Sequence, residues 1–256
     1  MFAALRAALI AAFGDVGRMK TFVVDFELAA VNAIRDVFPE TNVKGCTFHF
    51  RQALMRRIQS EGLKAVYEAS SAYPAVREWM RQIMAMTILP VFAIPLAWND
   101  LKCPPPTGVP SVDTRTLAFA AYFESTWISG DLPPSMWSHY DNEGPRTTNQ
   151  AEGYHNALNT SFGVPHPSLR IFLDWLQKCE FQVQCRLTQL SSGRPPKPKS
   201  EVYVRLDADI QAAKLKYGID IGNVFAYTFP HDHAWTLFRH HTTDYLRRIA
   251  YLIGAN

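Results

Sequence analysis

Asp25 stands where a carboxylate could bind a metal ion. It follows the apolar run from Thr21 to Val24, and this run predicts a short buried strand. Ligands and metals tend to bind beyond the carboxyl ends of parallel strands, so Asp25 is a candidate metal ligand. The alternative is structural: Asp25 caps the helix that is expected to begin near Glu27, whose first N–H groups need an acceptor.

Glu152 is a second candidate carboxylate, within the stretch RTTNQAEGYHN at 146–156. The spacing predicts a helix over 148–162 with an apolar stripe beside a polar one. The apolar stripe consists of Ala151, Tyr154, Leu158 and Phe162. The polar stripe consists of Asn149, Glu152, Asn156 and Asn159, with His155 next to it. In one interpretation Asn149 caps the helix and Glu152 reaches back to complete a capping box. In the other, Glu152 faces a hydrated metal ion, and the amides orient the ion or contact a phosphate backbone.

A third candidate is the pair Cys46 and His49. Sulfur and imidazole at this Cys-x-x-His spacing can form half of a zinc site, which needs two further ligands. The alternative is a buried cysteine with a hydrogen-bonded histidine at a strand-to-helix turn. The sequence offers these further donors: His155, Cys179, Cys185, His231 and His233.

The elements that must position these residues begin as an α/β pattern. Residues 2–13 predict an Ala- and Leu-rich helix, 21–25 a strand, and 27–38 an amphipathic helix that Pro39 ends. Residues 43–50, VKGCTFHF, predict a second strand that leads into the helix RQALMRRIQSEGL. This alternation is typical of a parallel sheet with right-handed crossovers.

After Gly62 the sequence predicts helices and no strands. The expected domains are an α/β core at 1–62, a helical insertion at 63–145, the Glu152 helix and its successor at 146–190, and a helical tail at 201–256. The basic, Pro-rich segment 191–200, SSGRPPKPKS, is a linker that cannot form a core.

The composition is that of a soluble globular protein, with 256 residues of which 48% are apolar. The net charge of +3 is compatible with a nucleic-acid partner but decides little, because no run of five like charges occurs. Four scattered cysteines do not form a disulfide framework, which favours the cytosol or nucleus. Pro90 and Pro95 interrupt the longest apolar stretch, so we expect no membrane span.

Several blocks together resemble the transposase domain of Mutator-like DNA elements, particularly the animal type. The stretch from Val23 to Leu63 looks like the second-aspartate block of that family, with Asp25 in DFE followed by Cys46 and His49. The stretch WSHYDNEGPRTTNQAEGYHNALN looks like the terminal-glutamate block, with Glu152 in an Asn-x-x-Glu-x-x-x-Asn pattern. Residues 166–180 are similar to the helix that usually follows. The resemblance covers about residues 5–190.

The resemblance implies a DDE-type enzyme with an RNase H-like fold and a helical insertion before the glutamate. In that fold two divalent ions, Mg²⁺ or Mn²⁺, are held by two aspartates and one glutamate for phosphoryl transfer on DNA. Asp25 and Glu152 would be ligands, with Asn149, His155 and Asn156 in support. The partner would be transposon-end DNA in the nucleus, and such enzymes commonly act as oligomers.

The sequence departs from the family at the first aspartate. Family members place it on an opening strand before the first helix, whereas here the helix of residues 2–13 comes first and Asp15 does not match the missing position. We therefore expect a truncated transposase, with a partial RNase H-like sheet, that is inactive in strand transfer. The alternatives are a co-opted, non-catalytic DNA- or protein-binding module, or a small zinc-stabilised domain at Cys46 and His49.

Overall fold

The computed structural model describes residues 1–16, 21–68, 70–162, 167–195, 198, 200–226 and 231–254. They are mostly helical, with one two-stranded parallel sheet. The chain divides into two compact units. The first unit comprises residues 1–147 and 206–256, and the second comprises 148–205.

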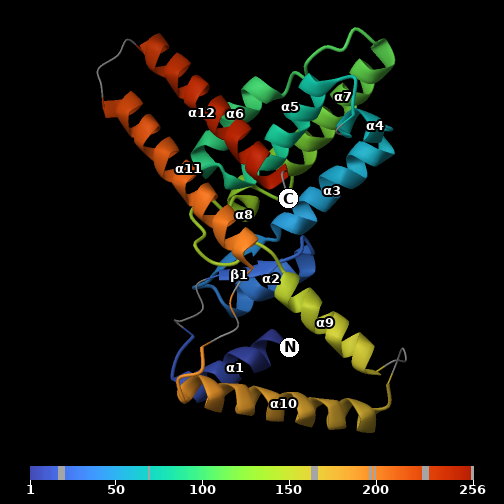
Figure 1. The fold of residues 1–256 in the computed structure, drawn as a ribbon, viewed down its shortest axis with the longest axis vertical. Helices are drawn as coiled ribbons and strands as arrows, with labels where there is room; N and C mark the ends of the chain where they lie inside the picture. Colours follow the sequence, from blue (N-terminus) through green and yellow to red (C-terminus); the bar gives the residue numbers. More distant parts are fainter. Residues whose placement is uncertain are drawn as a thin grey trace. The chain divides into compact units, whose positions relative to one another are not determined.

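The α/β part of the first unit follows the predicted order of elements (Figure 1). Helix α2 buries Val31 and Ile34, three residues apart, in a small apolar cluster beside the sheet. The two strands pair in parallel, with Thr21 opposite Asn42 and Val24 opposite Gly45. The elements are α1 (Phe2–Phe13), β1 (Thr21–Val24), α2 (Leu28–Val37), β2 (Asn42–Gly45) and α3 (Thr47–Ser60).

The second strand is shorter than the sequence predicts, because it ends at Gly45 and α3 begins at Thr47. The expected strand over 43–50 is therefore wrong from residue 46 onward. Phe50 explains the difference, since it continues the buried stripe of α3 at a spacing of four residues ahead of Leu54 and Ile58. Gly45 is required at the strand end, because a Cβ there would lie 2.1 Å from Cε1 of the Phe26 ring.

The region after Gly62 is helical, as predicted, and the structure assigns no strand to its described residues. Helix α5 buries seven of its twelve residues and forms much of the main core. The helices are α4 (Lys64–Tyr67), α5 (Pro74–Ala85), η1 (Met86–Ile88), η2 (Val91–Ala93), α6 (Ile94–Leu101), α7 (Pro110–Phe123), η3 (Glu124–Ile128) and α8 (Pro134–Trp137).

Aromatic rings in contact join these helices to α3, one pair stacked and one edge-to-face. The Phe50 ring lies 5.2 Å from the Trp137 ring and 4.7 Å from the Trp127 ring, centroid to centroid. Helices α11 (Glu201–Ala226) and α12 (His231–Gly254) complete the same core, and α12 packs against α5 and α6 (Figure 1). The structure thus groups residues 206–256 with the helices of 63–145, whereas the sequence predicted a separate tail.

The second unit contains α9 (Asn149–Phe162) and α10 (Leu169–Ser191).

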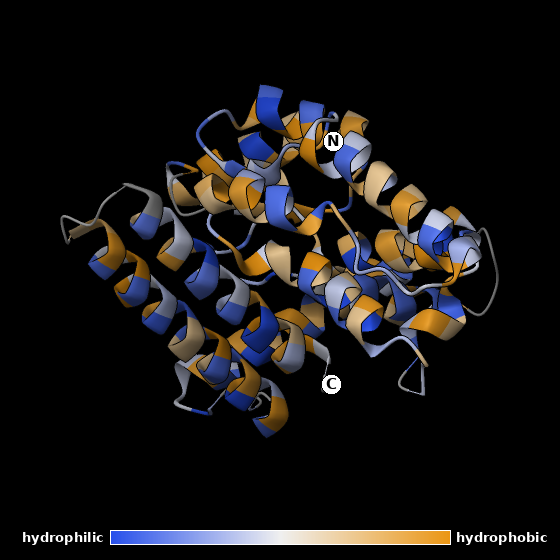
Figure 2. Ribbon diagram, turned by 90° about the horizontal axis from the view of Figure 1, so that it is seen from above, coloured by the Kyte–Doolittle hydropathy of each residue, from blue (hydrophilic) through white to orange (hydrophobic). Residues whose placement is uncertain are grey.

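Hydrophobic and hydrophilic residues alternate along the helices of both units, so individual helices show orange and blue bands in Figure 2. In the part of the chain that the structure describes, no helix is long and apolar enough to cross a membrane.

Candidate functional site

Asp25 lies at the carboxyl end of β1, as predicted, and its side chain is exposed. The capping interpretation of Asp25 is wrong, because the residue that precedes α2 is Glu27 and no side chain caps that helix. The backbone carbonyl of Val24, just before Asp25, accepts a 2.7 Å hydrogen bond from the N–H of Cys46. This bond fixes the end of β1 against the start of α3.

Glu152 is half-buried in the first turn of α9. The hydroxyl of Thr148 donates a 3.1 Å hydrogen bond to Oε1 of Glu152, and the N–H of Glu152 donates to the Thr148 carbonyl at 3.0 Å. Asn149 is the first helical residue, so the prediction that it stands before the helix as its cap is wrong, and Thr148 occupies that position. The side chain of Glu152 does bond back to the start of the helix, as predicted, but its partner is the hydroxyl of Thr148.

The two predicted stripes of α9 have different surroundings. Tyr154 and Phe162 of the apolar stripe contact the ring of Trp175 on α10, each with a centroid distance of 5.6 Å. The polar residues Asn149, His155 and Asn156 are exposed. The structure therefore presents the amide face to solvent within the second unit, while Asp25 belongs to the first unit.

Cys46 and His49 lie at the start of α3, as the strand-to-helix interpretation predicts. Cys46 is buried and directly precedes the helix, and His49 is half-buried in its first turn. Of the donors considered for zinc, His155, Cys179 and Cys185 belong to the second unit, and the side chain of His231 lies outside the described residues. Over the residues that can be described, no three His, Cys, Asp or Glu side chains form a group that could hold a metal.

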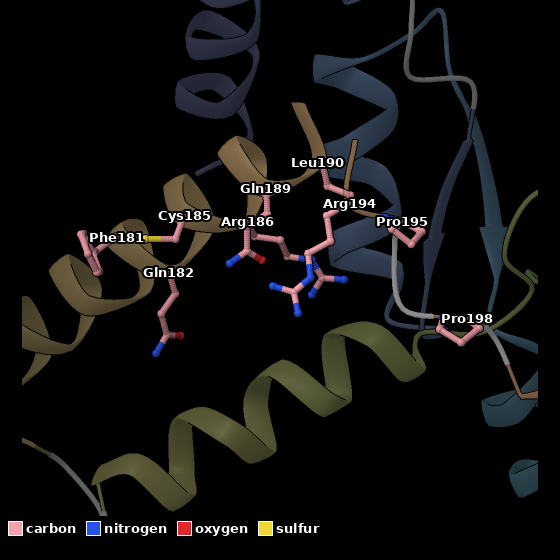
Figure 3. Close-up of a pocket in the computed structure, with 9 residues that line it drawn as sticks. All are labelled: Phe181, Gln182, Cys185, Arg186, Gln189, Leu190, Arg194, Pro195 and Pro198. Atoms are coloured by element: carbon pink, nitrogen blue, oxygen red, sulfur yellow. The ribbon is translucent and has the colours of Figure 1, made fainter. Parts of the chain in front are cut away.

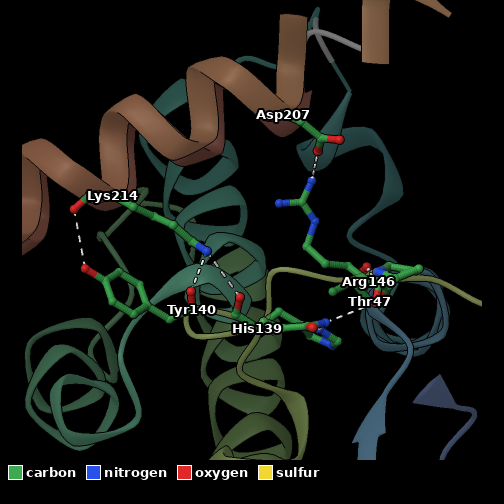
Figure 4. A network of polar contacts seen from close by, with 8 residues as sticks. Thr47, His139, Tyr140, Arg146, Asp207 and Lys214 are labelled. Atoms are coloured by element: carbon green, nitrogen blue, oxygen red, sulfur yellow. Dashed lines mark hydrogen bonds and ion pairs between the residues drawn. The ribbon is translucent and has the colours of Figure 1, made fainter. Parts of the chain in front are cut away.

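A buried histidine that the sequence analysis missed joins the sheet to the segment before α9 (Figure 4). His139 has no exposed surface, and its Nε2 lies 2.7 Å from the carbonyl oxygen of Gly45. Because that oxygen can only accept, Nε2 carries the proton, and Nδ1 accepts from Nδ2 of Asn142 at 2.9 Å. Burial lowers the pKa of His139 to about 4, with a further lowering from nearby Lys44, Arg146 and Lys214.

Two lysines surround the same segment, and both donate to backbone carbonyls. Nζ of Lys44 on β2 donates to the carbonyls of Ser135 and Ser138, at 2.8 and 2.9 Å. Nζ of Lys214 on α11 donates to the carbonyls of His139 and Tyr140. Burial lowers the pKa of both ammonium groups. Each lysine thus gives two of its three N–H donors to the backbone between Ser135 and Tyr140, and both lysines hold this stretch in place.

Arg146 anchors the chain just before α9. Its carbonyl accepts hydrogen bonds from both the N–H and the hydroxyl of Thr47, each at 2.9 Å. Its guanidinium forms an ion pair with Asp207 (Figure 4). Thr47 follows Cys46 directly, so the segment just before α9 is tied to the turn between β2 and α3 inside the first unit.

The second unit has a hollow of about 530 Å³ along the carboxyl-terminal half of α10. The side chains of Arg186 and Arg194 point into it from the helix and from the segment that follows (Figure 3). Gln182 and Gln189 add amide groups to the lining. This chemistry suits an anion that accepts several hydrogen bonds.

No protein-family model matches the chain, and neither a curated protein nor a solved structure gives a significant match. The resemblance of the sequence blocks to a known family therefore stays a prediction.

Proposed function

We propose that this chain is part of a DDE-type transposase of the Mutator-like kind, with a partial RNase H-like core. Asp25 and Glu152 are then two of the three carboxylates that hold Mg²⁺ or Mn²⁺ in such enzymes. The third belongs to the opening strand that the resemblance places before the helix of residues 2–13, so strand transfer requires that strand in addition.

The observation that carries the proposal is the double hydrogen bond from Thr47 to the Arg146 carbonyl. It joins the two blocks through residues that lie 99 positions apart in the sequence. The N–H of Cys46, one residue before Thr47, bonds to Val24, one residue before Asp25. Glu152 follows Arg146 by less than two helical turns of chain. Each candidate carboxylate therefore lies only a few residues along the chain from these hydrogen bonds.

The chemistry of the proposed site is phosphoryl transfer on DNA. Divalent ions held by Asp25, Glu152 and the third aspartate would supply activation of the attacking oxygen and stabilisation of the leaving oxygen. The role of Asp25 and Glu152 is to hold these ions. The exposed amides of Asn149 and Asn156 can orient metal-bound water, because an amide both donates and accepts hydrogen bonds.

The test is calorimetric titration with Mn²⁺ of the chain and of the same chain extended by a strand that carries an aspartate. The variants are Asp25→Asn and Glu152→Gln, which remove charge but keep hydrogen-bonding groups. The matched controls are Asp15→Asn in the first unit and Asp174→Asn in the second. We expect Mn²⁺ binding in the extended chain that both site variants lose and both controls keep. Unchanged Mn²⁺ binding in Asp25→Asn and Glu152→Gln would contradict the proposal.

A second candidate function is DNA binding without cleavage, and the distribution of charge favours it. Residues 148–205 contain seven Lys or Arg and four Asp or Glu, so this unit alone accounts for the whole net charge of +3. The hollow with Arg186 and Arg194 lies in the same unit. We infer that a DNA phosphate backbone occupies this hollow, since guanidinium groups bind phosphate through paired hydrogen bonds.

Fluorescence anisotropy with a labelled DNA duplex in EDTA tests this second function. The variant Arg186→Ala/Arg194→Ala should bind more weakly, and its slope of log affinity against log salt should fall by about 2, or about 0.9 for each phosphate contact. The control Arg35→Ala/Lys216→Ala removes equal charge from the first unit and should bind as the original chain does. Equal losses in the two variants would point to net charge alone and reject the hollow as the site.

A further inference from the structure

Helix α10 has two apolar faces, and α9 covers one of them. The half-buried residues of α10 are Phe172, Trp175 and Cys179, spaced by three and four residues along one side. Phe172 and Trp175 contact Phe162 of α9, with ring centroids 6.1 and 5.6 Å apart. This face holds the two helices of the second unit together.

The other face of α10, which we call the open stripe, consists of six exposed aliphatic residues: Leu169, Leu173, Leu176, Val183, Leu187 and Leu190. Their exposed fractions run from 38% at Leu176 to 71% at Leu169. Leu169, Leu176, Val183 and Leu190 recur every seven residues, and Leu173 and Leu187 fall four residues after two of them. A strict seven-residue period is typical of a helix that packs along a second helix in a left-handed coiled coil.

We propose that the open stripe binds α10 of a second copy of this chain, with the two helices antiparallel. In the register that we infer, four of the six aliphatic residues face aliphatic residues of the second copy, Val183 faces Glu180, and Leu169 extends past the end of the other helix. It places Leu173 opposite Leu190 and Leu176 opposite Leu187 in alternating layers of the two copies. Because the register is symmetric, every such contact forms twice, which a closed two-fold dimer requires.

The charged residue within the open stripe selects the antiparallel direction. Glu180 occupies the position between Leu173 and Leu187 in the repeat. Parallel helices would put Glu180 opposite Glu180 of the second copy, where like charges repel. The antiparallel register instead puts Glu180 opposite Val183 of the second copy. Arg186 of the second copy then lies about one helical turn away, on the flank of the seam, within reach of the carboxylate.

Helix length supports the same occupant. At about 1.5 Å per residue, the 23 residues of α10 extend for about 34 Å, and the antiparallel register overlaps residues 172–191 of each copy, which is nearly three heptads. The structure buries no residue of α10. A second copy supplies an identical stripe with the matching period and length, together with the positive charge that Glu180 needs.

Multi-angle light scattering of the full chain without DNA tests the proposal. We expect a concentration-dependent dimer that Leu176→Asp/Leu187→Asp converts to a monomer. The matched control is Ile171→Asp/Phe181→Asp, which puts the same charges on the exposed opposite side of α10 and should leave the dimer intact. Circular dichroism confirms that each variant keeps its helices. A monomeric original chain, or equal behaviour of the two variants, overturns the proposal.

Charge reversal tests the direction of the helices. Glu180→Arg and Arg186→Glu should each weaken the dimer, and the double variant should restore the original dissociation constant. Parallel helices give no such rescue, because residue 180 then faces residue 180 of the second copy and not residue 186. A double variant as weak as the single variants would overturn the antiparallel register. Because DNA is absent, this outcome is independent of the two proposed functions.

Discussion

Helices α5 and α10 show how differently the two units of this protein are stabilised. Helix α5 has 12 residues and buries seven of them, whereas α10 has 23 residues and buries none. The first unit therefore gains its stability from its own core. The second unit depends on one seam between α9 and α10, and it keeps apolar surface available for a partner.

The largest expected effect is in the aromatic centre of the first unit. Trp137→Ala should lower the free energy of unfolding by about 3–5 kcal/mol, because Trp137 is fully buried and stacks on Phe50. Trp175→Ala, at the half-buried seam of the second unit, should cost clearly less. Urea unfolding followed by circular dichroism measures both. Similar losses of free energy of unfolding in the two variants would contradict the proposed difference in stabilisation between the units.

The next effect is a dependence of stability on pH that comes from His139. Its pKa is about 4 in the folded protein and about 6.5 when unfolded, so the unfolded chain takes up the proton first as the pH falls. Stability should therefore fall between pH 6.5 and pH 4, by about 3 kcal/mol in total from this group. Urea unfolding at pH 7, 6 and 5 measures this slope.

His139→Gln should flatten that dependence, since an amide can donate to Gly45 and accept from Asn142 without titrating. The control is His155→Gln on the exposed face of α9, which should leave the dependence unchanged. An unchanged slope in His139→Gln would assign the pH dependence to other groups.

Two glycines sharpen the comparison further. Gly45→Ala should destabilise the first unit by about 1–3 kcal/mol, because the added methyl group would overlap the Phe26 ring. Gly153→Ala on α9 meets no atom within 4 Å and should stabilise that helix, by up to about 1 kcal/mol. Thermal unfolding of both variants should therefore give shifts of opposite sign, and shifts of the same sign would contradict this account.

The smallest effect is at the start of α9. Thr148→Ala removes the hydroxyl that donates to Glu152 and should weaken the first turn by about 1 kcal/mol. Hydrogen exchange of the α9 amides measures this local loss. Thr160→Ala, near the other end of the same helix, serves as the control and should leave the exchange of the first turn as it is.

The sequence predicted those parts of the fold whose signals are local. The helices near 2–13 and 148–162 were predicted within a residue or two, because apolar residues recur at helical spacing and are bounded by Gly, Pro or Asn. The strand over 43–50 was predicted too long, because alternating polar and apolar residues at 46–50 mimic a strand. Phe50 belongs to the helical stripe of α3 instead.

The site could be predicted only in part, for a similar reason. Asp25 and Glu152 stay predictions as metal ligands. Their placement at a strand end and in the first turn of a helix follows from local sequence and is confirmed. The role of His139 was missed, because its contact with Gly45 spans 94 residues and no local pattern indicates it. The packing of α11 and α12 against α5 depends on equally distant contacts, so the linker at 191–200 suggested a boundary that the core does not follow.

The ion pair between Arg146 and Asp207 has a consequence for how the chain could be rebuilt. Residues 148–205 form the second unit. Arg146 lies just before this segment and Asp207 just after it, so the ion pair holds the two ends of the insertion close together in the first unit. A segment whose two ends leave from one point is topologically an insertion, and its removal costs the host only a short bridging loop. The helices α9 and α10 can thus be treated as one removable insertion in the first unit.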